Sequence, residues 1–147
     1  NLIDDTDYGG YHTHSLVGIL AVEAPELPEF VAEEGLHVSY ARDVHDEGIA
    51  PCLERAIDHA TDHVDAVYLT VDIDVVDPTV APGTGTPEFG GIDATQLLRA
   101  MERLGECDAI CAVDLVEVAP RLDPSRTTQR LGAAALSRFL EAKFGRQ

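Results

Sequence analysis

The segment from Val67 to Gly91, VYLTVDIDVVDPTVAPGTGTPEFGG, limits the possible folds of this chain more than any other. Its apolar start predicts a buried strand, and three aspartates follow that start within six residues: Asp72, Asp74 and Asp77. Carboxylates crowded at the end of a buried strand repel one another and lose solvation. A cation bound between them would remove this cost. The segment therefore predicts a cation site where a buried strand ends.

Strand-like and helix-like patterns alternate along the chain. Strands are predicted over residues 16–24, 37–41, 66–73 and 108–118, and helices over residues 29–35, 46–63, 93–105 and 124–144. This alternation, with strongly apolar strands, favours a mainly parallel sheet covered by helices on both faces. We therefore predict one three-layer α/β/α domain over residues 1–147, with the carboxyl ends of its strands on one edge. Ligands of such sheets bind outside that edge.

Acidic residues from two predicted strands fall on this edge. Asp72 and Asp74 end one strand, and Glu117 ends another. Oxygen ligands at this density suit magnesium, manganese or calcium better than zinc or copper. The spacing does not fit a calcium-binding EF-hand loop, because the sixth position is not Gly and the twelfth is not Glu.

Three neighbouring acidic side chains have ordinary explanations beside the functional one. Asp77 precedes Pro78, and an Asp-Pro pair often begins a turn. Glu117 could form an ion pair with Arg121 instead of facing a ligand. Asp114 could lie on the same edge or form a salt bridge on the helix side of the sheet.

The charge balance excludes some classes of partner. The net charge is -17, from 27 acidic and 10 basic residues, and such a surface repels nucleic acids and anionic membranes. No apolar run approaches the roughly 20 residues that span a bilayer, and no signal-peptide pattern opens the sequence. Three cysteines without CxxC spacing predict free thiols in a reducing cytoplasm. The composition, with one lysine (Lys143) and 27 acidic residues, resembles that of cytoplasmic proteins from salt-in halophiles and is therefore haloarchaeal-like. An acidic protein from an ordinary organism is the alternative.

The segment DIDVVDPTVAPGTGTPEFGG resembles the signature of the ureohydrolase family, which includes arginase, agmatinase, guanidinobutyrase and formiminoglutamase. The APGTGTP form is most similar to agmatinases. Downstream, DLVEVAPRLD (Asp114 to Asp123) resembles the family's second half, and the resemblance runs from Val17 to Phe144. It implies an arginase-like α/β/α fold whose N-terminal part is missing here. Because the first residue is Asn1, we expect the C-terminal portion of a longer protein.

This resemblance also implies roles for particular residues. Asp72 and Asp74 match the family's metal-binding aspartates in a site that holds two manganese ions. Glu117 and Thr86 match positions that hold the guanidinium group of the substrate. The family's metals supply a hydroxide that attacks the guanidinium carbon, and the products are urea and an amine. A histidine on a loop then passes a proton to the leaving amine.

The upstream motifs of the family are altered or missing. A GGDHS-like stretch is absent, and LIDDTD (Leu2 to Asp7) resembles the DAHxD ligand motif without its histidine. Asp5 and Asp7 are therefore candidate metal ligands, with ordinary loop residues as the alternative. In YHTHS, His14 is the better match to the proton-shuttle histidine, and His12 is the other candidate.

The favoured function is manganese-dependent hydrolysis of a small guanidino substrate, in which agmatine is cleaved to putrescine and urea. The resemblance also implies that the chain forms a homo-oligomer, as family members do. Guanidinobutyrate and formiminoglutamate are alternative substrates. An inactive fragment, or a non-catalytic partner of an intact ureohydrolase, is a further alternative. YLTVDIDVV also resembles the opening of haloacid-dehalogenase-type phosphatases. That reading requires a downstream lysine, whereas Lys143 lies in the last predicted helix, and it leaves APGTGTPEFGG unexplained.

Overall fold

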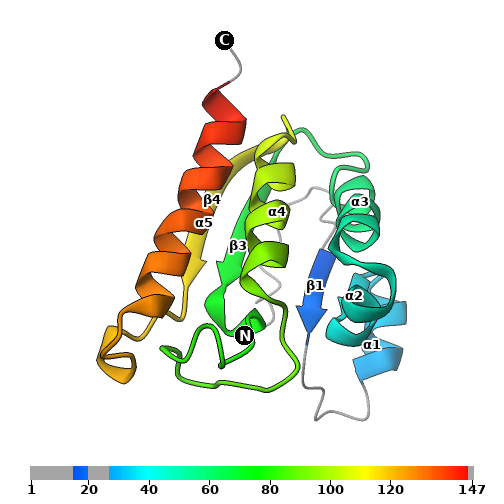
Figure 1. Cartoon of the computed structure of the whole chain (residues 1–147). Coiled ribbons are helices and arrows are strands. Elements are labelled where there is room, and N and C mark those ends of the chain that lie inside the picture. Colours follow the sequence, from blue (N-terminus) through cyan, green and yellow to red (C-terminus); the bar gives the residue numbers. More distant parts are fainter. Residues whose placement is uncertain (1–14, 20–26, 146–147) are drawn as a thin grey trace.

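The structure is a computed structural model that describes residues 15–19 and 27–145 (Figure 1). Its strands are β1 (Ser15–Ile19), β2 (His37–Tyr40), β3 (Val67–Asp72) and β4 (Ile110–Val116). Its α-helices are α1 (Leu27–Glu33), α2 (Ala41–Glu47), α3 (Ile49–Ala60), α4 (Ala94–Gly105) and α5 (Thr127–Phe144). Single 3-10 turns, η1 (Ile73–Val75) and η2 (Pro120–Leu122), follow β3 and β4. None of the described helices is both long and apolar enough to cross a membrane.

All four described strands pair in parallel. β1 pairs with β2 in one two-stranded sheet, and β3 pairs with β4 in the other. The predicted α/β architecture with parallel strands is thus confirmed. In the register of the second pair, Asp72 lies opposite Val116, so β3 and β4 end level with each other. The residues that leave both strands therefore emerge at one edge, as the sequence indicated.

Helices α4 and α5 pack together over one face of the β3–β4 pair (Figure 1). Buried apolar side chains from the strands and both helices form the core there, among them Val71, Ile73, Leu97, Met101 and Phe139. Gly105 permits a close approach of the two helices, because a Cβ at this position would lie 2.4 Å from the carbonyl oxygen of Phe139. The core thus fixes β3 and β4 from one side.

Asp114 lies on the face of the β3–β4 pair opposite these helices. It accepts a hydrogen bond of 2.5 Å from the hydroxyl of Tyr68, whose side chain is 61% exposed. Hydrogen bonds from the hydroxyls of Tyr68 and Thr70 lower the pKa of the Asp114 carboxyl. The partner of Asp114 is therefore a tyrosine on the neighbouring strand. Among the described residues, Asp114 forms no salt bridge on the helix side of the sheet, and it does not belong to the strand-end cluster.

The predicted elements differ from the observed ones mainly where glycine or a short turn intervenes. The helix predicted over residues 46–63 is interrupted at Gly48, whose φ of 94° separates α2 from α3. The strand predicted over residues 66–73 ends at Asp72 because η1 begins at Ile73. Asp93 caps α4: its side chain accepts a hydrogen bond from the Gln96 backbone N–H, and the Gln96 side chain accepts one from the Asp93 backbone N–H.

Two histidines, one from β2 and one from α3, lie close together, and their arrangement predicts a fold that is sensitive to mild acid. The rings of His37 and His59 lie 5.9 Å apart, and burial, with the positive charges of His59 and Arg55, lowers the pKa of His37 below its ordinary 6.5. The folded state therefore resists protonation of His37 more than the unfolded chain does. The free energy of unfolding keeps this contribution above pH 6.5 and loses it as the pH falls below that value.

We expect His37→Gln to reduce the loss of stability between about pH 8 and about pH 5, because Gln carries no titrating group. The measurement is the denaturant midpoint of both proteins at each pH. His63→Gln is the matched control, because the His63 side chain is 82% exposed. Equal acid sensitivity in the His37 variant and the parent would contradict this assignment.

Candidate active site

A single turn of 3-10 helix brings the first two aspartates together at the end of β3. Asp72 is the N-cap of η1, and its Oδ1 accepts a hydrogen bond of 3.0 Å from the backbone N–H of Asp74. The turn therefore places both carboxylates on the strand-end edge, with Ile73 between them fully buried in the core. The buried side chain of Ile73 thus fixes the turn in the core, and the aspartates on either side of it point to the edge of the sheet.

Negative charge accumulates at Asp72. Burial raises the pKa of its carboxyl above the ordinary value, and the charges of Asp74 and Glu117 raise it further, while the hydrogen bond from the Asp74 backbone opposes them. Two neighbouring carboxylates therefore act on Asp72 at this edge. A cation bound among them would stabilise the ionised form of Asp72.

The loop that follows β3 returns to this cluster. The hydroxyl of Thr86 donates a hydrogen bond of 3.0 Å to Oδ2 of Asp74. The preceding residue, Gly85, faces Glu117, since a Cβ at Gly85 would lie 3.9 Å from Oε2 of that glutamate. The structure thus gathers Asp72, Asp74, Thr86 and Glu117 around the ends of β3 and β4.

Glu117 has an unusual backbone conformation. Its φ is 61°, in the left-handed region that non-glycine residues rarely adopt, and its side chain is exposed. Among the described side chains it forms no salt bridge with Arg121. Strained backbone of this kind occurs often at functional sites, where surrounding contacts hold it in place. The unfavourable backbone conformation of Glu117 thus sets the direction of its carboxylate, and Arg121 does not neutralise the charge.

Asp77 organises a turn and is not part of the cluster. Its carboxylate accepts hydrogen bonds of 2.9 Å from the backbone N–H groups of Thr79 and Gly90. Hydrogen bonds from Thr79 and Gly90 lower the pKa of the Asp77 carboxyl. These contacts favour the turn explanation for this third aspartate.

The described part of the chain supplies an incomplete metal-binding set. No group of three or more His, Cys, Asp or Glu side chains is arranged to hold a metal among residues 15–19 and 27–145. Asp72 and Asp74 offer carboxylate oxygens of the type that manganese and magnesium prefer, so they fit one part of such a site. The candidates Asp5, Asp7 and His14 lie outside the described residues.

Three residues that hold the loop in place were missed in the sequence: Gly83 within the loop, and Asp123 and Thr128 outside it. Asp123 and Thr128 are buried, with 2% and 0% exposure, and Thr128 contacts the backbone of Gly83. The motif Asp-Pro-Ser before a helix is a recognisable turn-and-cap signal. This motif nevertheless does not indicate which loop Asp123 and Thr128 would contact.

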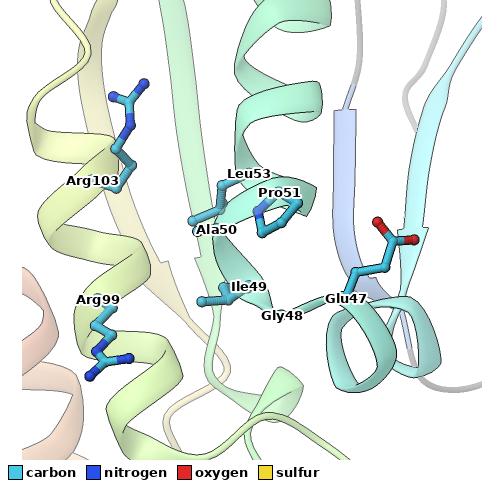
Figure 2. Close-up of a pocket in the computed structure, with 8 residues that line it drawn as sticks. All are labelled: Glu47, Gly48, Ile49, Ala50, Pro51, Leu53, Arg99 and Arg103. Atoms are coloured by element: carbon cyan, nitrogen blue, oxygen red, sulfur yellow. The ribbon is translucent and has the colours of Figure 1, made fainter.

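A pocket of about 270 Å³ lies elsewhere, between the first turn of α3 and helix α4 (Figure 2). Figure 2 shows Arg99 and Arg103 extending from α4 beside it. Arg103 is already held by Glu54, with hydrogen bonds of 2.6 and 2.7 Å. The pocket includes none of the strand-end carboxylates, so we assign it no part in the site.

Comparisons with known proteins bear on the family of this chain. The chain matches the family model described as the Arginase family over residues 10–141. It is 32% identical to an arginase of Brevibacillus brevis over 137 residues, which are 90% of this chain and 46% of the relative. It is 54% identical to an agmatinase of Halalkalibacterium halodurans over 63 residues, which are 42% of this chain and 22% of the relative.

The fold is similar to that of solved structures. The crystal structure of formimidoylglutamase from Bacillus subtilis superposes with a TM-score of 0.81 at 23% identity, over 87% of this chain and 40% of that one. This likeness concerns the fold alone. The chain spans less than half of the length of the arginase and formimidoylglutamase relatives named here.

Proposed function

The chain belongs to the arginase family, and from this premise we propose that it forms part of a manganese-dependent amidinohydrolase that cleaves agmatine to putrescine and urea. One observation carries the proposal. Two carboxylates on η1, a threonine hydroxyl and a glutamate from the next strand meet at the shared end of β3 and β4. This grouping suits a cation on one side and a guanidinium group on the other.

In this proposal, Asp72 and Asp74 hold divalent metal. Manganese bound there would supply hydroxide near neutral pH, because divalent cations lower the pKa of water. Burial is the main cause of the raised pKa of Asp72, and the charges of Asp74 and Glu117 add to it; those charges support this role, since they also attract a cation. Asp5 and Asp7 remain predicted additional ligands.

Glu117 would orient the substrate. A guanidinium is a planar cation, and a carboxylate can accept two parallel hydrogen bonds from it. The exposed carboxylate of Glu117 is available for this contact, and Thr86, next to the Gly85 that faces Glu117, offers a hydroxyl that is bonded to Asp74. Together they would fix the guanidinium carbon in one position relative to the nucleophile, which is the main requirement for attack on a poor electrophile.

The leaving amine needs a proton, and we assign its delivery to His14. An imidazole titrates near neutral pH and therefore suits proton transfer in either direction. Its position in YHTHS is the basis of this assignment.

Agmatine is favoured over other substrates by the APGTGTP loop and by the 54% identity to an agmatinase. Guanidinobutyrate and formiminoglutamate are the alternatives within the family. We also propose a cytoplasmic homo-oligomer made of single-domain chains, adapted to high salt because the net charge of -17 requires screening.

The test is a substrate panel with the manganese-loaded chain in molar salt. Urea release should be fastest with agmatine, slower with guanidinobutyrate and slowest with arginine, while formiminoglutamate would release formamide. Fastest turnover of another member of the panel would reassign the substrate within the family. No turnover of any member would support the inactive or non-catalytic alternative.

Glu117→Gln should reduce kcat/KM for agmatine by about 100-fold, because a neutral amide loses the charge-assisted pair with the guanidinium. Bound manganese should stay within about 2-fold of the parent, since Glu117 is not among the proposed ligands. Glu88→Gln is the matched control, because Glu88 is an exposed glutamate of the same loop region. An unchanged kcat/KM in Glu117→Gln would remove the glutamate from substrate binding.

A further inference from the structure

The loop that bears Thr86 is held to the start of α5 through Gly83. The backbone N–H of Gly83 donates a hydrogen bond of 2.8 Å to Oγ1 of Thr128, which is fully buried. The carbonyl oxygen of Gly83 accepts a hydrogen bond of 2.7 Å from the backbone N–H of Ala119. Both backbone groups of one glycine are therefore fixed by the chain that follows β4.

Thr128 is itself fixed by Asp123. Its hydroxyl donates to Oδ2 of Asp123 at 2.9 Å, and its backbone N–H donates to the same oxygen at 2.8 Å. Because a hydroxyl has one proton and an ionised carboxylate only accepts, the Thr128 hydroxyl must accept from Gly83. Bonds to Ser125 and Thr128 lower the pKa of Asp123 to about 2, so the carboxylate stays charged at neutral pH.

The contact leaves no space for adjustment. A Cβ at Gly83 would lie 2.7 Å from Cβ of Asp123 and 2.9 Å from Oγ1 of Thr128. Consecutive hydrogen bonds in a buried chain strengthen one another, so the path from Gly83 through Thr128 to Asp123 is stiff. The loop therefore cannot move toward α5, and it moves away only by leaving buried polar groups without partners.

This anchor lies close in sequence to both substrate-facing residues. Thr86 is three residues after Gly83, and Glu117 is two residues before Ala119. The hydrogen bond between Gly83 and Ala119 thus joins the two segments that carry Thr86 and Glu117.

We infer that Thr128 and Asp123 are positioning residues that set the distance between Thr86 and Glu117, and with it the fit of the guanidinium group. The inference rests on the proposed function, because it assigns these residues to the substrate loop of that site. Neither residue touches the substrate. They act through the backbone of Gly83.

The test compares Thr128→Val, Thr128→Ser and Thr127→Val in the full manganese-loaded chain. Val keeps the shape of Thr but lacks the hydroxyl, whereas Ser keeps the hydroxyl. Thr127 is exposed and its hydroxyl contacts Ser125, so Thr127→Val is the matched control on the same helical turn. The readouts are KM and kcat for agmatine, the dissociation constant of agmatine from amide chemical shifts, bound manganese and Tm.

Thr128→Val should raise both KM and the agmatine dissociation constant by about 10- to 100-fold, because small displacements at a positioned site have effects of this size. Thr128→Ser should restore both constants to within about 3-fold of the parent, and bound manganese should not change. An unchanged KM in a folded Thr128→Val, or a lower Tm with no change in agmatine binding, would overturn the inference.

A second variant keeps the test decisive if Thr128→Val does not fold. Asp123→Asn retains the volume of the side chain but loses the charge, and it should raise the agmatine dissociation constant by about 3- to 10-fold. Unchanged agmatine binding in folded Asp123→Asn would overturn the inference. If the parent chain itself neither binds nor hydrolyses agmatine, the proposed function fails, whereas normal parent activity with unaffected variants rejects only the positioning role.

Discussion

Replacing Asp72 by Asn is expected to abolish both manganese binding and urea release. Asp72 is half-buried between Asp74 and Glu117, and its carboxylate contributes charge that a neutral amide cannot supply. Even the indirect partners of metal ligands contribute about 10- to 100-fold to metal affinity or activity, so removal of a ligand should cost roughly 100-fold or more. Metal analysis of the dialysed protein and a urea assay with agmatine measure the two effects.

Asp65→Asn is the matched control for this experiment. Asp65 is an exposed aspartate in the turn before β3, and its replacement removes the same charge outside the cluster. We expect manganese content and activity close to those of the parent. Parental turnover in Asp72→Asn would exclude Asp72 as a ligand.

The largest expected effect on stability comes from Gly91→Ala. A Cβ at Gly91 would lie 2.4 Å from the backbone nitrogen of Asp77 and 2.5 Å from the carbonyl oxygen of Val75. These atoms belong to the bridge between Val76 and Ile92, which supports the turn after η1. Because backbone atoms cannot move aside as a flexible side chain can, we expect a loss of about 3 kcal/mol in the free energy of unfolding.

Gly35→Ala separates steric overlap from backbone preference. Gly35 has a φ of 63°, but a Cβ there meets no atom within 4 Å. Its replacement should cost only about 1 kcal/mol, which is the cost of a left-handed conformation for a residue with a Cβ. Both values come from denaturant unfolding in molar salt. Equal losses of unfolding free energy in the two variants would show that small shifts of the surrounding backbone remove the steric overlap at Gly91.

The sequence contained most of the information on the strand-end site. Asp72 and Asp74 follow an apolar run, and parallel strands place their ends on one edge, so a meeting with Glu117 was predictable. The sequence could not decide whether Glu117 pairs with Arg121 or faces a ligand, because the left-handed backbone of Glu117 depends on the packing around it. Asp77 was undecidable from sequence, since an aspartate before proline fits a turn as well as a ligand set.

The fold was predictable in type and less so in detail. Alternating patterns indicated parallel strands and a helix over residues 93–105, both of which the structure contains. The division of one predicted helix at Gly48 was missed because a single glycine is also tolerated inside helices. The anchor at Gly83 joins residues 45 positions apart, and such long-range contacts leave no periodic signal in a sequence.

The count of manganese bound to the purified chain tests the central claim most directly. The protein is loaded with manganese in molar salt, free metal is removed, and bound metal is compared with that of the double variant Asp72→Asn, Asp74→Asn. The account predicts that the parent retains manganese, up to the two ions typical of its family, and that the variant retains none. A parent that retains no manganese, or a variant that retains as much as the parent, would contradict the assignment of these aspartates as metal ligands.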